Sequence, residues 1–176
     1  RRWAGGWAGG CVPHFALCAQ WRLLHIAFMD KDRVAEILNE IGVLLELKGE
    51  NPFKSRAYAN AARAIEGLEE PIERLVAENR LDQIKGIGDG LREKITLLVT
   101  TGRLAYHEEL RASIQPGMVE MLGIPSLGPK KVRALKQRLG VASIEELESA
   151  CKEGRVAALD GFGEKSQEKI LEGIQH

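Results

Sequence analysis

The sequence has few aromatic residues and few cysteines, and both scarcities limit what the chain can be. Aromatic residues make up only 5% of its 176 residues, so aliphatic side chains and alanine have to fill the interior. Together with many Glu, Lys and Arg residues this composition is typical of helices, and no run of residues is typical of a strand. The three cysteines form no even disulfide framework and match no zinc-site spacing. We therefore predict an all-α protein of a reducing cytoplasm.

Long apolar runs are also absent, which argues against a membrane protein. The first 28 residues hold all three tryptophans and no acidic residue, but polar residues such as His14, Gln20 and Arg22 interrupt them. The segment is too broken for a signal peptide and too short to span a bilayer. We interpret residues 1–28 as a non-native or disordered extension and Met29 as the natural start, and we expect no membrane contact.

The chain lacks an excess of positive charge. It carries 25 basic and 25 acidic residues, and residues 1–28 hold three of the basic residues and none of the acidic ones, so the remainder has a net charge of −3. Non-specific nucleic-acid binders usually present a basic surface. Any affinity for DNA must therefore come from local patches and backbone amides.

What is present is one short pattern that occurs three times. Each copy begins with two apolar residues three positions apart. A turn follows, in which an apolar residue has glycine or serine before it and glycine after it, and a helix begins directly after the turn. The copies are Leu81–Gly88 (LDQIKGIG), Met121–Gly128 (MLGIPSLG) and Val156–Gly163 (VAALDGFG). This pattern predicts three helix-hairpin-helix units, in which the N–H groups that begin the second helix face outward and attract phosphate. The predicted phosphate-binding residues are Gly86, Gly88, Gly90, Gly128, Lys130, Lys131, Gly161, Gly163 and Lys165.

The second hairpin is the strongest phosphate candidate. Its second helix begins with Lys130 and Lys131, although the positive end of a helix dipole disfavours cations there. A DNA phosphate would offset this repulsion, and acidic side chains elsewhere in the fold are the alternative. In the other two hairpins Asp89 and Glu164 follow the last glycine and offer caps for their own helices, so those hairpins are weaker candidates.

The remaining patterns predict helices on both sides of the hairpins. Apolar residues spaced as on one helix face begin at Asp30, and Gly49 is expected to end that helix. Ser143 and Glu146 form a capping box for a later helix. We predict two small helical domains, residues 29–107 and 108–176. The other expected segments are a helix over 53–65, a short helix from Pro71, the first hairpin unit over 81–101, a helix over 106–114, a break at 115–117 and the second hairpin unit over 118–139.

Three motifs in order make the chain from Met29 onward resemble the N-terminal part of a bacterial or archaeal family X DNA polymerase. They are Asn51–Tyr58 (NPFKSRAY), Ile84–Gly88 (IKGIG) leading to Glu93–Ile95 (EKI), and the two further hairpins. The resemblance implies a 5′-deoxyribose-phosphate lyase-like domain, then a fingers subdomain that grips DNA. A palm with the catalytic carboxylates and its Mg²⁺ should follow, with a nuclease domain a further C-terminal possibility. This sequence contains no such carboxylate pair, so we do not expect it to polymerise DNA by itself.

The resemblance also implies residues for the lyase reaction. Lys94 matches the lysine that forms the Schiff base, Lys54 the lysine that binds the 5′-phosphate, and Tyr58 a tyrosine of the pocket. The sequence departs from the animal members at Gly90 and Tyr106, where those proteins carry additional pocket lysines. The lyase reaction needs no cofactor.

The residues around Lys94 leave two interpretations open. Leu91, Leu97 and Leu98 lie at helical neighbour spacing, which favours an amine made reactive by desolvation. However, Lys169 lies at the same offset in the third hairpin, again within a Glu-Lys-Ile triplet, where no lyase role is expected. A solvated surface lysine is therefore the alternative for Lys94.

The family further implies that hairpins bind K⁺ or Na⁺ through backbone carbonyl groups. The corresponding carbonyls are those of Asp82, Ile84, Ile87, Leu122, Ile124 and Leu127. In the second hairpin Ser126 replaces the first glycine, which is expected to strain a turn that needs a positive φ.

Three functions are compatible with these features. The first is a monomeric repair-polymerase fragment of a prokaryotic cytoplasm that binds gapped, nicked or abasic duplex DNA and carries lyase activity at Lys94. The second is a non-catalytic, structure-specific DNA-binding module. The third is a helical protein-interaction domain, which the net charge permits.

Overall fold

The protein is described here by a computed structural model of residues 29–175, in which all regular secondary structure is helical. This confirms the predicted all-α class, whereas the predictions for residues 1–28 lie outside the described part of the chain. None of the described helices is long and apolar enough to cross a membrane. The elements are α2 (Lys31–Lys48), α3 (Pro52–Glu66), α4 (Ile72–Ala77), the 3-10 turn η1 (Leu81–Gln83), α5 (Asp89–Thr101), α6 (Ala105–Ala112), α7 (Pro116–Glu120), η2 (Met121–Gly123), α8 (Pro129–Leu139), α9 (Ile144–Lys152) and α10 (Glu164–Ile174).

The first two helices begin and end within one residue of where the sequence predicts. The Asp30 side chain accepts a hydrogen bond from the Arg33 N–H at 2.8 Å, and Gly49 ends α2 with a φ of 80°. Asn51 caps α3 by accepting the Phe53 N–H at 2.9 Å. Polar side chains thus satisfy N–H groups that would otherwise lack a partner at both helix starts.

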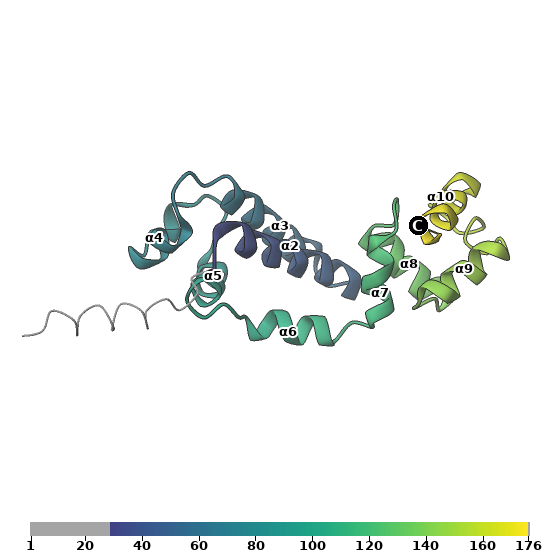
Figure 1. Ribbon diagram of the computed structural model, residues 1–176, viewed down its shortest axis with the longest axis horizontal. Helices are drawn as coiled ribbons and strands as arrows, with labels where there is room; N and C mark the ends of the chain where they lie inside the picture. The colour runs from purple at the N-terminus through teal and green to yellow at the C-terminus, as the bar shows by residue number, and fades with distance from the viewer. Residues whose placement is uncertain (1–28, 176) are drawn as a thin grey trace, which may run out of the picture.

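Helices α2 and α3 form the main packed pair (Figure 1). At Gly42 the two backbones approach so closely that an added Cβ would lie 3.1 Å from the Ser55 carbonyl oxygen. The apolar stripe of α2 and one face of α3, including Tyr58 and Ile65, are buried between them. Glycine in mid-helix is tolerated here because it allows this close packing.

The three predicted hairpins share one backbone geometry. Each hairpin has two N–H groups that lie three residues apart, and each donates to the carbonyl oxygen of the residue three positions before it, at 3.0–3.3 Å. The donors are Ile84 and Ile87, Ile124 and Leu127, and Leu159 and Phe162. The first turn residue of each copy has a positive φ, which is 94° at Gly86, 69° at Ser126 and 87° at Gly161. The expected strain at Ser126 is therefore confirmed, because L-residues rarely adopt this conformation.

The predicted break at residues 115–117 is present but lies two residues earlier, at residues 113–115 between α6 and α7. Pro116 begins α7, as expected for a residue whose fixed φ suits the first helical position. Position 117 requires glycine, because a Cβ there would lie only 2.3 Å from the Ala142 carbonyl oxygen. The predicted domain boundary after residue 107 falls inside α6, so α6 itself joins the two parts of the chain.

The capping box of α9 is confirmed with a small shift. The Ser143 side chain accepts the Glu146 N–H at 3.3 Å, and the Glu146 carboxylate accepts the N–H of Ala142 at 2.7 Å. The glutamate therefore reaches one residue further back than in the usual box, where it binds the N–H of the capping residue.

The two ends of the molecule are connected by α2 and α6 (Figure 1). Helix α6 runs beside α2, where His107 Nε2 and Arg111 Nε lie 3.0 and 3.7 Å from the Glu40 carboxylate. At the C-terminal end of α2, Arg133 of α8 donates to the Glu46 carbonyl oxygen at 3.5 Å. The second hairpin is thus held against the C-terminal end of α2.

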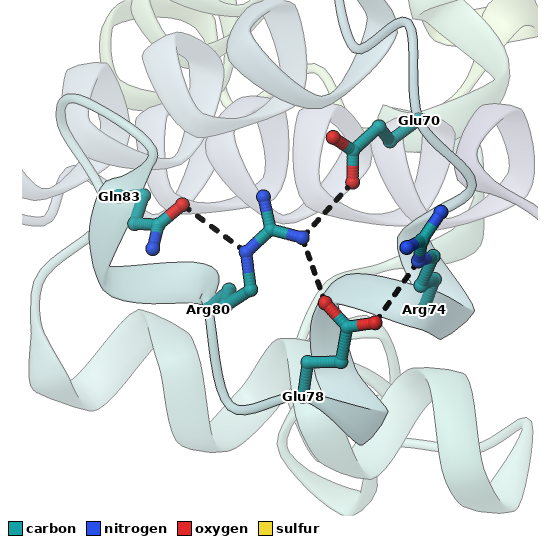
Figure 2. Close-up of polar contacts among 5 residues, drawn as sticks. All are labelled: Glu70, Arg74, Glu78, Arg80 and Gln83. Carbon is teal, nitrogen blue, oxygen red and sulfur yellow. Dashed lines mark hydrogen bonds and ion pairs between the residues drawn. The ribbon is translucent and has the colours of Figure 1, made fainter.

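A surface ion-pair network leads into the first hairpin (Figure 2). The Arg80 guanidinium donates to Glu70, Glu78 and Gln83 at 3.2, 2.7 and 3.2 Å, and Arg74 donates to Glu78 at 2.9 Å. Hydrogen bonds from Arg80 and Arg74 lower the pKa of Glu78. The network joins the segment before α4, α4 itself and η1, and so fixes where the first hairpin begins.

Candidate functional site

The predicted lyase residues meet in one cluster around the ring of Tyr106. The Nζ atoms of Lys54 on α3 and Lys94 on α5 lie 5.4 and 5.5 Å from the centre of this ring. Tyr58, one turn after Lys54, stacks on Tyr106 with ring centres 6.3 Å apart and an interplanar angle of 16°. Three helices that are separated in sequence thus bring two lysines and two tyrosines together.

Tyr106 is the residue whose importance the sequence did not reveal. The sequence identifies it only as a departure from lysine, whereas in the structure it is the common neighbour of all three predicted lyase residues. An ammonium group over an aromatic face is stabilised by about 0.5–1 kcal/mol at an exposed site. The ring of Tyr106 therefore helps to position both lysine side chains.

Burial and neighbouring side chains distinguish the groups of the cluster. Burial raises the pKa of Tyr58 to about 12, and the neighbouring Tyr106 hydroxyl acts in the same direction. The Tyr106 hydroxyl beside it also raises the pKa of Lys54, with a smaller contribution from Glu50 at 3.4 Å. Lys54 is therefore a permanent cation, suited to binding an anion.

Lys94 is half-buried rather than enclosed. Its Nζ donates to the Gly90 carbonyl oxygen at 3.1 Å, one helical turn earlier. Of the leucines predicted to surround it, Leu98 is buried and Leu91 is half-buried, but Leu97 remains 43% exposed. The apolar surroundings proposed from sequence are thus only partly formed.

The second helices of the three hairpins begin without a side-chain cap. Their capping residues are Gly88, Gly128 and Gly163, and no side chain accepts a hydrogen bond from the first N–H groups that follow within the described residues. Asp89 pairs with Arg92 instead of capping α5. Within the described residues, α5 and α10 therefore begin with two free backbone N–H groups each, as the sequence predicts. At α8 only the Lys130 N–H is free, because Pro129 has no N–H and the Lys131 N–H donates to the Gly128 carbonyl oxygen at 3.0 Å.

The second hairpin adds basic side chains to this geometry. Lys130 is exposed, with no acidic side chain within 4.0 Å among the described residues. Lys131 folds back, so that its Nζ donates to the Ser126 carbonyl oxygen at 3.1 Å and lies 5.6 Å from the ring centre of Phe162 in the third hairpin. The two predicted phosphate-binding lysines thus differ, one being free in solvent and one joining two hairpins.

The third hairpin carries its lysines at the surface. Lys165 and Lys169 are both exposed, and Glu164 makes no capping bond to α10. Lys169 lies beside Pro125 and Ser126 of the second hairpin, along a cavity of about 600 Å³. Among residues 29–175 no aromatic ring stands over it, in contrast to its positional equivalent Lys94.

The predicted cation-binding carbonyls occur in equivalent turns. The carbonyl oxygens of Ile84 and Ile124 accept the N–H groups of Ile87 and Leu127 at 3.2 and 3.1 Å. Among the backbone hydrogen bonds of the described turns, loops and helix caps, none is accepted by the other four carbonyl oxygens, which are those of Asp82, Ile87, Leu122 and Leu127. The residues that the structure describes contain no group of His, Cys, Asp and Glu able to hold a metal ion.

Comparisons with known proteins agree with this geometry. Residues 29–104 match a helix-hairpin-helix domain family, and residues 118–175 match a SAM-like helix-hairpin-helix tandem family. Over 146 residues, or 83% of the chain, the sequence is 36% identical to the DNA polymerase/3′-5′ exonuclease PolX of Bacillus subtilis strain 168. The aligned region is 25% of the length of that relative. These similarities indicate a DNA-binding, polymerase-related chain.

Proposed function

The chain is related to the N-terminal part of the family X DNA polymerases, and on that premise we propose that it binds gapped, nicked or abasic duplex DNA through its hairpins. The uncapped starts of α5, α8 and α10 support this proposal, because each presents at least one free backbone N–H group to an incoming phosphate, which at α8 is that of Lys130. Lys130 adds a cation at the start of α8. Since the chain has no overall positive charge, binding depends on these local donors.

We further propose that the cluster around Tyr106 carries 5′-deoxyribose-phosphate lyase activity. The observation that supports it most is the meeting of Lys54, Tyr58 and Lys94, which lie on two helices up to 40 positions apart in sequence. Lys54 supplies the fixed positive charge for the 5′-phosphate, and Lys94 supplies the amine.

In this reaction the uncharged Lys94 amine attacks the aldehyde carbon C1′ of the opened sugar and forms an imine with loss of water. The imine makes the C2′ proton acidic. Loss of that proton allows the C3′–O bond to break, and the phosphate oxygen leaves with the DNA strand. Hydrolysis of the imine then restores Lys94, so no metal or organic cofactor is required. The substrate has to draw the Lys94 amine away from the Gly90 carbonyl oxygen that it contacts at 3.1 Å.

Borohydride trapping tests this activity. The chain and its Lys94→Ala variant would be incubated with duplex DNA that carries an incised 5′-deoxyribose phosphate, and adducts would be counted after reduction. The matched control is Lys169→Ala, which removes a lysine at the same offset in the third hairpin. We expect trapping to be lost with Lys94 and kept without Lys169. Equal trapping by all three proteins would refute the assignment of Lys94.

The absence of any adduct despite measurable DNA affinity would favour the non-catalytic DNA-binding module instead. Salt-independent or absent DNA binding would favour the protein-interaction domain. Replacing Lys130 and Lys131 by glutamate tests the hairpin assignment, because two reversed charges at the start of α8 should abolish most of the phosphate affinity there. Unchanged affinity in this variant would contradict the role of the second hairpin.

We also propose that the first two hairpins bind K⁺ or Na⁺ through the carbonyls of Asp82, Ile84 and Ile87, and of Leu122, Ile124 and Leu127. The shared turn geometry of the two hairpins supports an equivalent pair of sites. If these sites contribute, replacing K⁺ by a larger organic cation at constant ionic strength should weaken DNA binding. A Mg²⁺ ion is proposed only for a palm, which is not part of this sequence.

A further inference from the structure

Four arginines stand apart from the others because no acidic side chain neutralises them. Of the eleven arginines in the described part of the chain, seven have a carboxylate oxygen within 4.0 Å. The four without one are Arg56, Arg63, Arg103 and Arg133. Acidic residues outnumber basic ones from Met29 onward, so an unpaired arginine is a feature to explain.

Arg56 and Arg63 lie together on one face of α3, opposite the lyase cluster. With about 100° per residue, both are rotated by roughly 180–200° from Lys54 around the helix axis. Both are exposed, and they line a groove of about 190 Å³ between α2 and α3. The amide of Asn39 and the carboxylate of Glu46, both on α2, line the same groove.

We propose that this groove binds the phosphodiester backbone of a DNA strand, as a second DNA surface separate from the hairpins. This inference rests on the proposed DNA-binding function. Arg56 and Arg63 are seven residues apart, which is about 10 Å along the helix. Their two guanidinium groups, each able to donate two parallel hydrogen bonds to a phosphate, can therefore contact two separate phosphates of one strand.

The groove also lies next to α8 of the second hairpin. Glu46 lines the groove, and its carbonyl oxygen accepts a hydrogen bond from Arg133 of α8. The proposed strand therefore passes close to α8. The Glu46 carboxylate is the one acidic group that lines the groove, and it opposes the binding of phosphate.

The dependence of DNA affinity on salt tests this proposal. The Kd of the full chain for gapped duplex DNA would be measured by fluorescence anisotropy between 50 and 200 mM KCl. For the double variant Arg56→Gln/Arg63→Gln we expect the slope of log K against log salt to become shallower by about 1.8, since each lost phosphate contact removes about 0.9. The affinity at 0.15 M salt should fall by roughly tenfold or more.

The matched control is Arg33→Gln/Arg155→Gln, which removes the same charge from two exposed arginines that pair with Glu36 and Glu153. We expect a slope close to that of the unmodified chain. In the opposite direction, Glu46→Gln should raise the affinity several-fold. Circular dichroism melting of each variant ensures that folded proteins are compared.

Two failures are distinguishable. If the unmodified chain shows no salt-dependent affinity for DNA, the proposed function itself is wrong. If the unmodified chain binds DNA but Arg56→Gln/Arg63→Gln has the same slope and affinity as the control, only the groove is wrong, and the hairpins carry all of the binding.

Discussion

Substitution of Ser126 measures the free-energy cost of a positive φ at the first turn residue of the hairpin. It occupies the position of Gly86 and Gly161, and all three residues have φ values between 69° and 94°. A side chain in this left-handed region costs about 1–2 kcal/mol, whereas glycine there is unstrained but loses about 0.5–1 kcal/mol more backbone entropy on folding. Ser126→Gly should therefore stabilise the protein by about 0.5–1 kcal/mol.

The surroundings make this estimate simple. The only hydrogen bond that the structure describes at Ser126 uses its carbonyl oxygen, which Lys131 reaches at 3.1 Å, and glycine keeps that group. Space around the equivalent glycines is open, since a Cβ at Gly86 or Gly161 would meet nothing within 4 Å. The free-energy change therefore reports backbone conformation without a steric contribution.

Thermal unfolding followed by circular dichroism provides the assay. For a chain of this length about 1 kcal/mol corresponds to roughly 2–4 °C in Tm. We expect Ser126→Gly to raise Tm by about 2 °C, and Gly86→Ser to lower it by a similar amount, with the double exchange close to the unmodified protein. A lower Tm for Ser126→Gly would refute the reasoning, because it would mean that the serine hydroxyl stabilises the turn by more than the strain costs.

Three further predictions concern the cluster and the second hairpin. Folding raises the pKa of Tyr58 from 10 to about 12, so the stability that the neutral Tyr58 contributes is complete below pH 10 and is lost as the pH rises toward 12. In urea unfolding, the free energy of unfolding of Tyr58→Phe should therefore fall less between pH 10 and about pH 12 than that of the unmodified chain. Tyr106→Phe keeps the ring beside both pocket lysines and should retain trapping, whereas Tyr106→Ala should lower it several-fold, and equal effects would contradict the positioning role of the ring. Gly117→Ala should destabilise the chain by about 2 kcal/mol or more, since its Cβ would lie 2.3 Å from the Ala142 carbonyl oxygen, whereas Gly123→Ala meets open space and should be tolerated in the same melting assay.

The sequence was most informative where the physics is local. Helix starts at Asp30, Asn51 and Ser143 follow from side chains that accept N–H groups two or three residues later. The hairpins follow from glycine where φ is positive and from apolar residues three positions apart. The two-residue displacement of the break near Pro116 has a local origin as well, since proline both ends helices and begins them, and only its neighbours decide between the two.

By itself, the sequence determined the all-α class, the three hairpins and the lysines that the family resemblance suggests, because these depend on residues within a few positions of one another. Only the tertiary structure decided that Lys54, Tyr58 and Lys94 meet around Tyr106, since this requires α3, α5 and α6 to converge. It also decided which arginines remain unpaired along the groove between α2 and α3. Contacts between distant segments depend on the packing of many side chains at once, and no local pattern in the sequence encodes that packing.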